Sequence, residues 1–577
     1  SVTLDTDSDG VGNNADTDDD GDGALDTADA FPLDKTETLD TDADGIGNNA
    51  DTDDDGDGVL DAADAFPLDS SESNPCASNG TIQGDFEAPH CFYSTAFADS
   101  GVNITTDMTL TDLADDGAHV FYGSVFVGDV GATAAELALD GITKGGDGPK
   151  ITLEAGVTMA FVDNTKFFVI GRGSQIFARG TEAKPITITS LSDVQGTIES
   201  PEAISQWGGM VINGFAVTNK CSYTGTRGEA GFALDGTCDL GSEGSEGQDT
   251  NRYGGDNDAD NSGVLEYFIV KHTGAQVANG DELNGITFTG VGSGTTVSNA
   301  QAYSTYDDGF EFFGGAVNMD NYVAIYVNDD SIDIDEGYNG TITNALVIQS
   351  ETNGNRCIEA DGIGSYSSKT DAFIQDMFTR KLNSRPTIKN LTCIFSPVQK
   401  VGGDNVTAGT TATGTHDPGA GFRLREGLWP TIENALVIGT LQVSEAGSDN
   451  WAIRVDDTVA SDGFALGNAS INGAVFAAFT KSSKTIAGSN VSDWLVANND
   501  VVFADIAENV VVNPTAAADD GLVLVDGTPA IFGLTTGATP AGGAAYAGGA
   551  LPSGGTNWAS WAYGIFDGNR GQALWFE

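Results

Sequence analysis

The stretch that decides the fold lies in the middle of the chain, where residues 298–302 read SNAQA, residues 320–325 read DNYVAI and residues 343–348 read TNALVI. Each stretch places an asparagine just before a short run of small or apolar residues, and these asparagines are 22 and then 23 residues apart. A coil of a β-helix needs about this length, and stacked coils can hold an asparagine in the left-handed conformation while its amide bonds along the stack. The asparagines in this register are Asn299, Asn321, Asn344, Asn390, Asn434 and Asn472.

A second match has the same spacing. Residues 306–312, YDDGFEF, align with residues 328–334, NDDSIDI, at an offset of 22. Because alternate residues of a strand share one face, the alignment predicts that Phe310 stacks on Ile332 inside the fold. By the same rule, Phe312 should stack on Ile334. A β-sandwich would also contain many short strands, but it would not produce a repeated register. The sequence therefore predicts an all-β chain folded as a right-handed parallel β-helix.

Short apolar alternations broken by Gly, Asn and Asp extend over the chain from about residue 100, and they are typical of strands. Four of these segments are ITLEAGVTMAF (151–161), WGGMVING (207–214), DNSGVLEYFIVKHTG (260–274) and YDDGFEFFGGAVN (306–318). Together they resemble a family of bacterial cell-surface β-helix proteins related in architecture to pectate-lyase-like proteins. The resemblance covers about residues 115–350. It implies a fold and an exterior location, and says little about chemistry.

The N-terminal segment, which we call the leader, contains one module twice. Residues 4–34 and residues 39–69 are nearly the same sequence displaced by 35, and each holds two loops of the pattern D-x-D-x-D-G. Calcium takes six to eight oxygen ligands, alternate aspartates put carboxylates on one side of a loop, and the glycine allows the sharp turn that closes it. The spacing therefore predicts calcium binding, with Asp16 as the distal ligand of the first loop.

The expected calcium ligands are eighteen aspartates, enough for roughly four ions when carbonyls and water complete the shells. They are Asp5, Asp7, Asp9, Asp16, Asp18, Asp20, Asp22, Asp26 and Asp29 in the first module, and Asp40, Asp42, Asp44, Asp51, Asp53, Asp55, Asp57, Asp61 and Asp64 in the second. Leu25, Phe31 and Leu33, with their counterparts in the second copy, are too few for a core, so metal must supply the folding energy. Without calcium, the composition favours an acidic disordered linker.

The leader resembles the thrombospondin type 3 repeat over about residues 1–73, through its DTDSDG, NNADTDDDGDG and LD segments. EF-hands share the D-x-D-x-D-G motif, but here no helical pattern flanks the loops and the glutamate at loop position 12 is absent. The resemblance implies a calcium-stiffened rod or spacer.

The formal charge of −61, from 85 acidic and 24 basic residues, makes nucleic acid and anionic membranes unsuitable partners. No run of about 18 apolar residues is present, so no membrane span is expected. The chain begins without Met or a charged-then-apolar leader peptide, as a processed protein would. Weak calcium loops need the millimolar calcium found outside cells, so we expect a secreted, extracellular or cell-surface protein.

The six cysteines lie in no metal-binding pattern, and their order indicates three local disulfides. The expected pairs are Cys76 with Cys91, Cys221 with Cys238, and Cys357 with Cys393. The first two would close short loops, whereas more chain intervenes in the third. A reducing cytosol would prevent all three pairs.

The densest acidic cluster outside the leader is a candidate site with three interpretations. It comprises Asp307, Asp308, Glu311, Asp329, Asp330, Asp333, Asp335 and Glu336. The cluster could be a set of solvated turns, a calcium site, or a glycosidase carboxylate pair. A calcium-assisted lyase also needs a basic residue, for which Arg356 and Lys271 are the nearest candidates. The four histidines are isolated, and serine-hydrolase, zinc and nucleotide motifs are absent, so we predict no catalytic residues and no organic cofactor.

These observations predict four regions. They are the leader (1–73), an N-terminal cap with the first strands (74–130), the β-helix (131–500) and a Gly/Ala-rich C-terminal cap with an aromatic tail (501–577). The tail should cover an exposed end of the solenoid or present aromatic rings to sugar or a neighbour. We expect a non-enzymatic calcium-binding structural or adhesive protein with glycans as further partners, self-associating end to end into homo-oligomers or filaments. The alternative is a secreted polysaccharide-binding or polysaccharide-cleaving β-helix.

Overall fold

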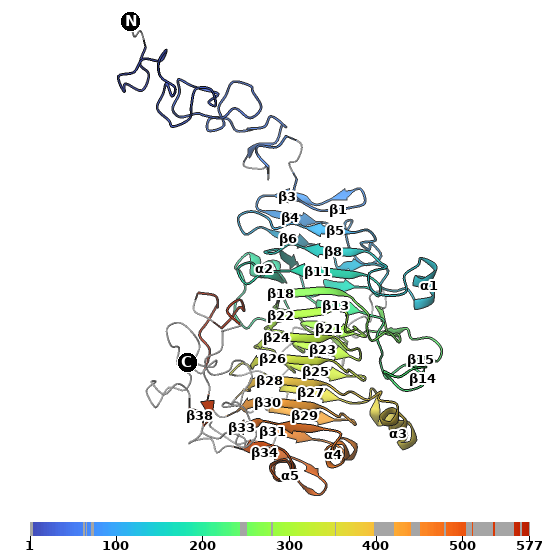
Figure 1. Cartoon of the computed structure of the whole chain (residues 1–577). Coiled ribbons are helices and arrows are strands. Elements are labelled where there is room, and N and C mark those ends of the chain that lie inside the picture. The colour runs from blue at the N-terminus through green and yellow to red at the C-terminus, as the bar shows by residue number, and fades with distance from the viewer. Residues whose placement is uncertain are drawn as a thin grey trace.

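The structure is a computed structural model of the whole chain, shown in Figure 1. It describes residues 4–61, 64, 66–70, 74–242, 251–278, 281–351, 354–396, 420–439, 451–477, 480–503, 510–511, 535–536, 559–565 and 568–575.

Two long sheets form the body, and every ladder in them is parallel among the described residues except the β3–β4 hairpin. One sheet has ten strands: β7 (Val125–Val127), β10 (Phe167–Ile170), β13 (Gly209–Asn213), β21 (Ile286–Thr289), β23 (Phe310–Phe313), β25 (Ile332–Asp335), β27 (Arg356–Asp361), β29 (Ala420–Arg425), β31 (Trp451–Val455) and β34 (Thr480–Ser483). Each coil contributes one strand to this sheet, and the strands stack down the molecule as in Figure 1. The expected all-β parallel β-helix is therefore confirmed.

The other sheet has seventeen strands. They are β3 (Asp85–Glu87), β4 (His90–Tyr93), β5 (Met108–Leu110), β6 (Ala118–Phe121), β8 (Lys150–Leu153), β9 (Thr158–Phe161), β11 (Gln175–Arg179), β12 (Ile186–Ser190), β18 (Gly263–Lys271), β22 (Thr296–Tyr303), β24 (Asn318–Ile325), β26 (Thr341–Ile348), β28 (Thr387–Ile394), β30 (Thr431–Ile438), β32 (Ser470–Asn472), β33 (Ala474–Ala477) and β37 (Val501–Phe503). Parallel stacking already begins at β4 on β6, so the stack starts before the expected boundary at residue 131.

Short elements decorate the turns between the stacked strands. The helices are α1 (Ala134–Leu139), α2 (Leu191–Val194), α3 (Asp371–Thr379), α4 (Thr458–Ala465) and α5 (Val491–Asn498), with a 3-10 turn at Tyr366–Ser368. The antiparallel hairpins are β1 (Ser78–Asn79) with β2 (Ile82–Gln83), β14 (Tyr223–Thr224) with β15 (Ala233–Leu234), β16 (Leu240–Gly241) with β17 (Arg252–Tyr253), β19 (Gln276–Ala278) with β20 (Asp281–Glu282), β35 (Thr485–Ile486) with β36 (Ser489–Asn490), and β38 (Val510–Val511) with β39 (Thr535–Thr536). Among the described residues, no helix is long and apolar enough to cross a membrane.

The predicted asparagine register is confirmed for five of its six members. Asn299, Asn321, Asn344, Asn390 and Asn434 all have positive φ, between 52° and 62°. Each side-chain amide from the second onward donates to the amide oxygen of the asparagine in the preceding coil, at 2.9–3.0 Å. This ladder bends each long strand at the same point and fixes the register of the coils.

The prediction for Asn472 is wrong by one residue. Asn472 pairs with Glu433, so Gly473, with φ 69°, takes the position of Asn434 in the next coil. Glycine adopts the left-handed conformation without a side-chain penalty, and the bend therefore continues there without an asparagine.

The core is a single stack of apolar side chains inside the coils. Phe310 pairs with Ile332, Phe312 pairs with Ile334, and all four side chains are buried, as predicted. Near the N-terminal end of the body, this interior is filled by aromatic rings. Each ring stacks on the next in the order Tyr93, Phe121, Phe161 and Trp207, with ring centroids 4.5, 5.7 and 5.0 Å apart. Stacked rings add packing energy to the area that they bury.

The C-terminal tail lies along the side of the solenoid, which corrects the expected end cap. Tyr563 exchanges two hydrogen bonds with Gln301 of β22, at 2.7 and 2.8 Å. The Trp575 Nε1 donates to the backbone oxygen of Gln349 at 2.8 Å. The outer face of the long strands is apolar, including Tyr303 and other buried side chains, and the apolar residues of the tail pack against it. Trp558, Phe566 and Phe576 lie outside the described residues.

The C-terminal end of the stack is covered by other elements. Helix α5 packs against β31, β34 and β37, and its Val491 and Leu495 join the main core. Figure 1 shows α5 at the far end from the leader.

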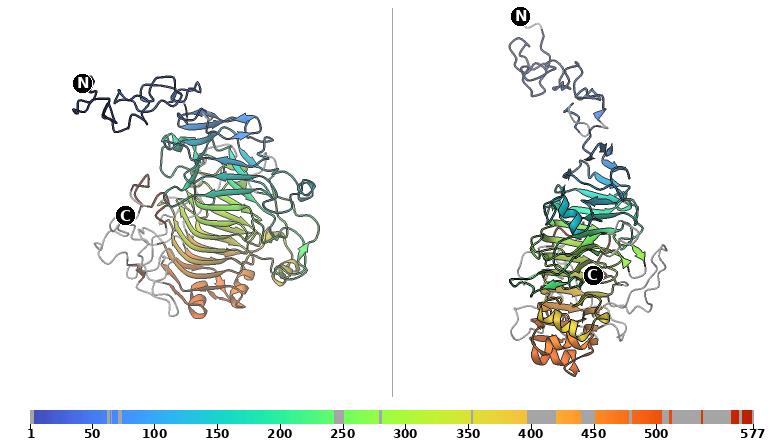
Figure 2. Two further views of the ribbon diagram at one scale, coloured as in Figure 1. Left: turned by 45° about the horizontal axis from the view of Figure 1, so that its top comes forward. Right: turned by 90° about the vertical axis from the view of Figure 1, so that its right-hand side faces the viewer.

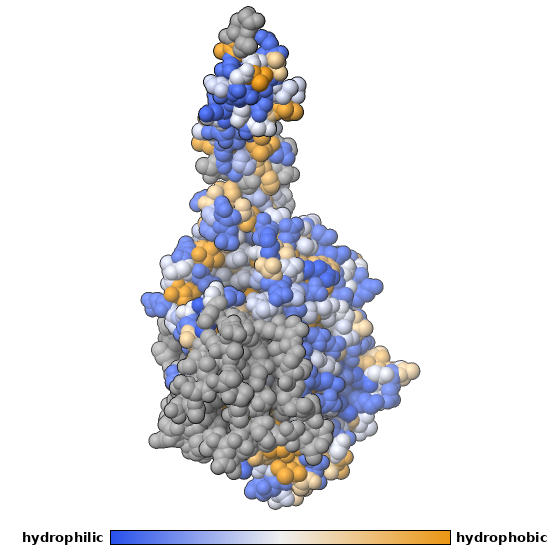
Figure 3. All heavy atoms as spheres, turned by 60° about the vertical axis from the view of Figure 1, so that its left-hand side comes forward, coloured by the Kyte–Doolittle hydropathy of each residue, from blue (hydrophilic) through white to orange (hydrophobic). Residues whose placement is uncertain are grey.

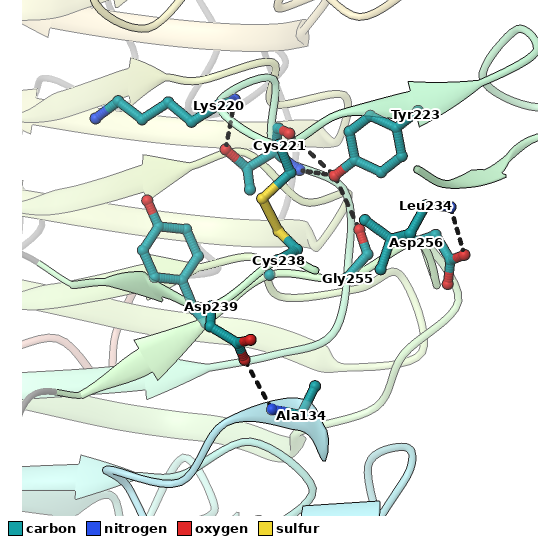
Figure 4. Close-up of a disulfide and its surroundings, with 12 residues drawn as sticks. Ala134, Lys220, Cys221, Tyr223, Leu234, Cys238, Asp239, Gly255 and Asp256 are labelled. Atoms are coloured by element: carbon teal, nitrogen blue, oxygen red, sulfur yellow. Dashed lines mark hydrogen bonds between the residues drawn. A yellow bond between two sulfur atoms is a disulfide. The ribbon is translucent and has the colours of Figure 1, made fainter. Parts of the chain in front are cut away.

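All three expected disulfides are present: Cys76–Cys91, Cys221–Cys238 and Cys357–Cys393. Figure 4 shows the second, which closes the loop that carries β14 and β15. The Tyr223 hydroxyl beside it donates to the backbone oxygens of Thr218 and Gly255, at 3.0 and 2.9 Å. These bonds hold the loop against the body.

The leader projects from the N-terminal end of the body, as both views of Figure 2 show. Its described residues form turns and bends, apart from a 3-10 position at Asp61, and no strand precedes β1 in the part of the leader that the structure describes. Leu25, Leu33, Leu60 and Leu68 are more than half exposed, and the leader surface in Figure 3 is largely hydrophilic with scattered apolar spots. Side-chain burial therefore cannot account for the order of this segment.

Candidate functional sites

Four loops of the leader each gather three carboxylates. One oxygen from each aspartate of a loop lies within 4.8 Å of the other two. The sets are Asp5, Asp7 and Asp9; Asp18, Asp20 and Asp22; Asp40, Asp42 and Asp44; and Asp53, Asp55 and Asp57. These are the four loops that the sequence pattern singles out.

The same backbone turn closes each of the four loops around its first aspartate. The Asp18 Oδ2 accepts the backbone N–H of Gly23 at 3.1 Å, and Asp53 Oδ2 accepts that of Gly58 at 3.2 Å. Asp5 and Asp40 accept the corresponding N–H groups at 3.2 Å. The closing glycines have φ between 93° and 105°, a conformation in which a side chain would be strained. The D-x-D-x-D-G spacing thus makes the turn that brings the carboxylates together.

Several of these carboxylate oxygens point inward and have no hydrogen-bond partner. Asp20 is 4% exposed and Asp55 is 7% exposed, and the Oδ2 of each is buried and unpaired. Burial, reinforced by neighbouring carboxylates, raises the pKa of both groups above the ordinary value. Lys35 is the only basic residue in the leader sequence. Buried, unpaired carboxylates of one sign are costly, and an oxygen-seeking cation is the group that fits them.

The distal aspartates of each module lie within electrostatic reach of different carboxylates. Asp29 lies close enough to Asp20 for its charge to raise the Asp20 pKa, whereas Asp26 and Asp16 act in the same way on Asp19. The second module repeats this arrangement. The charge of Asp64 raises the pKa of Asp55, and the charges of Asp61 and Asp51 raise the pKa of Asp54.

Asp19 and Asp54 were missed by the sequence reasoning. Each has a buried, unpaired Oδ1. Strict alternation along the D-D-D triplet assigns the middle aspartate to the outside, but the turn rotates it inward. The one sequence feature that could have indicated Asp19 and Asp54 is the repetition of this triplet in both modules.

A second site lies on the outer face of the ten-stranded sheet, where charged residues stack from coil to coil. We call it the charged strip. One column runs through Glu311, Asp333, Glu359, Arg423 and Arg454, which pair in register on β23, β25, β27, β29 and β31. Beside it lie Asp335 on β25, and Asp361 and Arg425, which pair in register on β27 and β29. Alternation places these side chains outside because their strand neighbours fill the core.

Glu359 is the centre of the charged strip. Its carboxylate contacts Arg356 at 2.7 Å, Arg423 at 3.1 Å and Arg425 at 2.5 Å. Burial opposes ionisation of Glu359, but the three guanidinium groups outweigh it and hold the Glu359 pKa below its ordinary value. Glu359 is therefore an anchor for the arginines and not a proton donor.

The pKa values of Asp335 and Asp361 shift in the opposite direction to that of Glu359. Burial, together with the negative charges of Glu336 and Asp361, raises the pKa of Asp335 to about 7. Burial likewise raises the pKa of Asp361 to about 7, although its ion pair with Arg425 opposes the shift. A carboxyl group with a pKa near neutrality can donate or accept a proton under physiological conditions.

The acidic cluster expected from the sequence spreads over two parts of the fold, which Arg356 links through its contact with Asp330 at 3.5 Å. Glu311, Asp333 and Asp335 belong to the charged strip, and Arg356 joins it. Asp307, Asp308, Asp329 and Asp330 lie in the turns that precede β23 and β25. Glu336 is fully buried, where Tyr253 and Thr218 donate to it at 2.6 and 2.7 Å and Lys220 pairs with it, so its role is structural.

Lys271, His119 and His272 are not in the strip. Lys271 pairs with Asp193 at 2.7 Å on another face of the body. Burial lowers the pKa of His119 and His272 to about 4, which keeps both rings neutral, and His416 lies outside the described residues. Glu359, Asp361, Arg423 and Arg425 were missed, because long insertions separate their strands in sequence and hide the register.

The match of this chain to a family model agrees with this architecture. Residues 130–525 match the family described as the pectate-lyase-like β-helix domain, and the chain belongs to that family. Among solved structures, the Dettilon tailspike protein (gp208) is similar at 11% identity over 76% of this chain and 75% of that one, with a TM-score of 0.18. The search of curated proteins found no match.

Proposed function

We propose that this protein is a calcium-binding structural or adhesive protein of the extracellular surface, in which the leader is a calcium-stiffened spacer that carries the β-helix. The observation that supports this most directly is the set of inward, unpaired carboxylate oxygens in four repeated loops. A segment with exposed leucines and buried like charges requires a cation to be ordered. The likeness of the leader to thrombospondin type 3 repeats points to the same role.

The location follows from two independent features. Three disulfides persist in oxidising compartments, and loops of this weak calcium-binding type fill only where calcium is in the millimolar range. Both conditions hold outside the cell.

A calcium titration of the intact chain by isothermal calorimetry tests the proposal. The double variant Asp20→Asn, Asp55→Asn should bind about two fewer calcium ions than the unmodified chain, because each substitution removes a buried carboxylate from one loop. The matched control is Asp34→Asn, since Asp34 is exposed, hydrogen-bonded to Thr36 and outside the four loops. Equal stoichiometry in the double variant and the unmodified chain would overturn the assignment.

The charged strip supports a second candidate function, binding or cleavage of polysaccharide. Carboxylates accept hydrogen bonds from sugar hydroxyls, and arginines donate to sugar oxygens or to uronic-acid carboxylates. Asp335 and Asp361 could supply a proton donor and acceptor of the kind that glycosidases use. Membership of a family described as pectate-lyase-like supports this reading.

Incubation with a panel of neutral and acidic polysaccharides, with assays for bound chain and for new reducing or unsaturated ends, tests the second function. Asp361→Asn should abolish cleavage, and Arg425→Gln should weaken binding by about tenfold, as loss of a buried charge-assisted contact does. Asp320→Asn is the control, because Asp320 is exposed on β24 of the other sheet. Absence of binding and of cleavage across the panel would remove this candidate and leave the structural role.

End-to-end self-association remains a proposal. The aromatic tail lies along the side of the body, so the surface that would meet a neighbouring leader is instead the end formed around α5 and β37.

A further inference from the structure

A buried histidine completes a chain of hydrogen bonds at the N-terminal end of the β-helix, where β4 meets β6 (Figure 1). His119 of β6 is 1% exposed. Its Nε2 lies 2.8 Å from the backbone oxygen of Thr111, and its Nδ1 lies 2.8 Å from the hydroxyl of Tyr93 on β4. The Tyr93 hydroxyl also accepts the backbone N–H of Ala77 at 3.0 Å. Thr111, Tyr93 and Ala77 all belong to residues 74–113, which we call the cap segment.

These contacts fix the tautomer of the His119 ring. A backbone carbonyl can only accept hydrogen bonds, so Nε2 carries the ring proton and donates to Thr111. Nδ1 is then an acceptor, and the Tyr93 hydroxyl donates to it. A second ring proton, on Nδ1, would leave the tyrosine proton without this acceptor in a buried place. The hydrogen bonds between the cap segment and His119 therefore require a neutral ring.

A second histidine joins the same two strands. The His90 Nδ1 on β4 accepts the backbone N–H of Ala118 on β6 at 3.1 Å. A ring nitrogen that accepts a hydrogen bond carries no proton, so protonation of this nitrogen removes the bond. The exposed carboxylate of Glu87 pairs with His90 across the β3–β4 hairpin. Two hydrogen bonds that join β4 to β6 therefore depend on uncharged imidazole rings.

The surroundings of His119 make the closed cap segment sensitive to acid. Burial lowers the pKa of His119 from its ordinary value of 6.5 to about 4, although the hydrogen bond to Thr111 and the charge of Asp112 oppose the shift. The residues in register with His119 are uncharged: Cys91 on β4 and Met159 on β9. When the cap segment opens, the ring enters water and recovers its ordinary pKa. The closed form is therefore fully favoured above about pH 6.5 and loses stability as the pH falls toward about 4.

We propose that His119 and His90 form an acid-sensitive lock that holds the cap segment on the first coils of the β-helix. Acid loosens the cap segment and uncovers Phe121, on which Tyr93 stacks with ring centroids 4.5 Å apart. It also weakens the joint between leader and body, because the leader is attached through this segment. The parallel ladders from β4 to β6 and from β5 to β8 remain as further connections, so the body itself stays folded. The lock does not depend on calcium binding by the leader.

Hydrogen exchange of the intact chain, read by mass spectrometry of its peptides, tests the lock between about pH 7.5 and about pH 5, where ordinary carboxyl groups do not titrate. After correction for the intrinsic pH dependence of exchange, opening of the cap segment and β6 should become about tenfold more favourable between about pH 6.5 and about pH 5, because opening takes up a proton. Peptides from β30 and β33, which contain no histidine, should show no such increase. Opening of the cap segment that does not change with pH would overturn the lock.

Nitrogen chemical shifts of isotope-labelled histidine read the two tautomers directly. His119 should stay neutral in the closed chain, with its proton on Nε2. His272 provides the contrast, because its Nδ1 donates to the backbone oxygen of Ala203 at 2.6 Å and must carry the proton. A charged His119 ring at about pH 6, or a proton on its Nδ1, would contradict the lock.

Substitution distinguishes a proton lock from a histidine that only fills space. His119→Gln should remove most of the pH dependence of cap opening, because an amide does not titrate in this range. His272→Gln is the matched control at another buried histidine and should leave that pH dependence in place. An unchanged pH dependence in His119→Gln would refute the role of this ring. If His119→Gln fails to fold, the chemical shifts and the exchange profile of the unmodified chain decide the question.

Discussion

Chelation of calcium should make residues 4–70 sensitive to protease while the body stays resistant. Without the ion, carboxylates such as Asp20 and Asp55 remain buried beside like charges, and the exposed leucines supply too little burial to offset that repulsion. The body is held by the continuous core and three disulfides, so it should survive as one large fragment. Limited proteolysis with peptide mapping, with and without chelator, measures both parts in one sample.

Single substitutions in the leader test whether each module depends on its own carboxylates. In millimolar calcium, Asp20→Asn should open the first module to cleavage and leave the second protected, whereas Asp34→Asn should behave as the unmodified chain. A leader that resists protease equally with and without chelator would contradict calcium-dependent folding.

Replacing Phe312 by alanine should destabilise the body by about 3–5 kcal/mol, the usual effect of removing a buried phenylalanine. The Phe312 ring stacks on Phe288 with centroids 5.1 Å apart and pairs in register with Ile334, so its loss leaves a cavity shared by three coils. Chemical denaturation followed by tryptophan fluorescence measures the change.

The chain provides a matched control one residue away. Phe313 follows on the same strand but points outward and is only partly buried, so Phe313→Ala should cost much less. Similar losses for the two variants would mean that the inward and outward faces of β23 are wrongly assigned.

The sequence predicted the coil register because a left-handed asparagine and a two-residue alternation are local properties. Asn299, Asn321 and Asn344 recur at nearly one coil length, and their amide ladder is the physical reason. The prediction failed where the local signal was ambiguous: at Asn472 a neighbouring glycine serves the bend equally well.

The charged strip could not be found in this way. Asp361 and Arg425 are 64 residues apart and meet only because the intervening chain leaves the stack and returns. The position of the tail could not be predicted for the same reason. The composition indicates that Tyr563 and Trp575 need an apolar partner, but it does not show which surface of the fold supplies it. The leader loops were predictable because their ligands lie within a few residues of one another.

The lateral attachment of the tail also determines how the molecule would bear load. Tyr563 is bonded to Gln301, 262 residues earlier, in the middle of the stack. A force applied between the leader and residue 575 would therefore enter the body near β22 and β26 and bypass the coils from β28 to β37. Those coils would carry tension only after the tail had peeled away. The hydrogen-bonded tail would thus divert part of a stretching load away from the coils that follow β26.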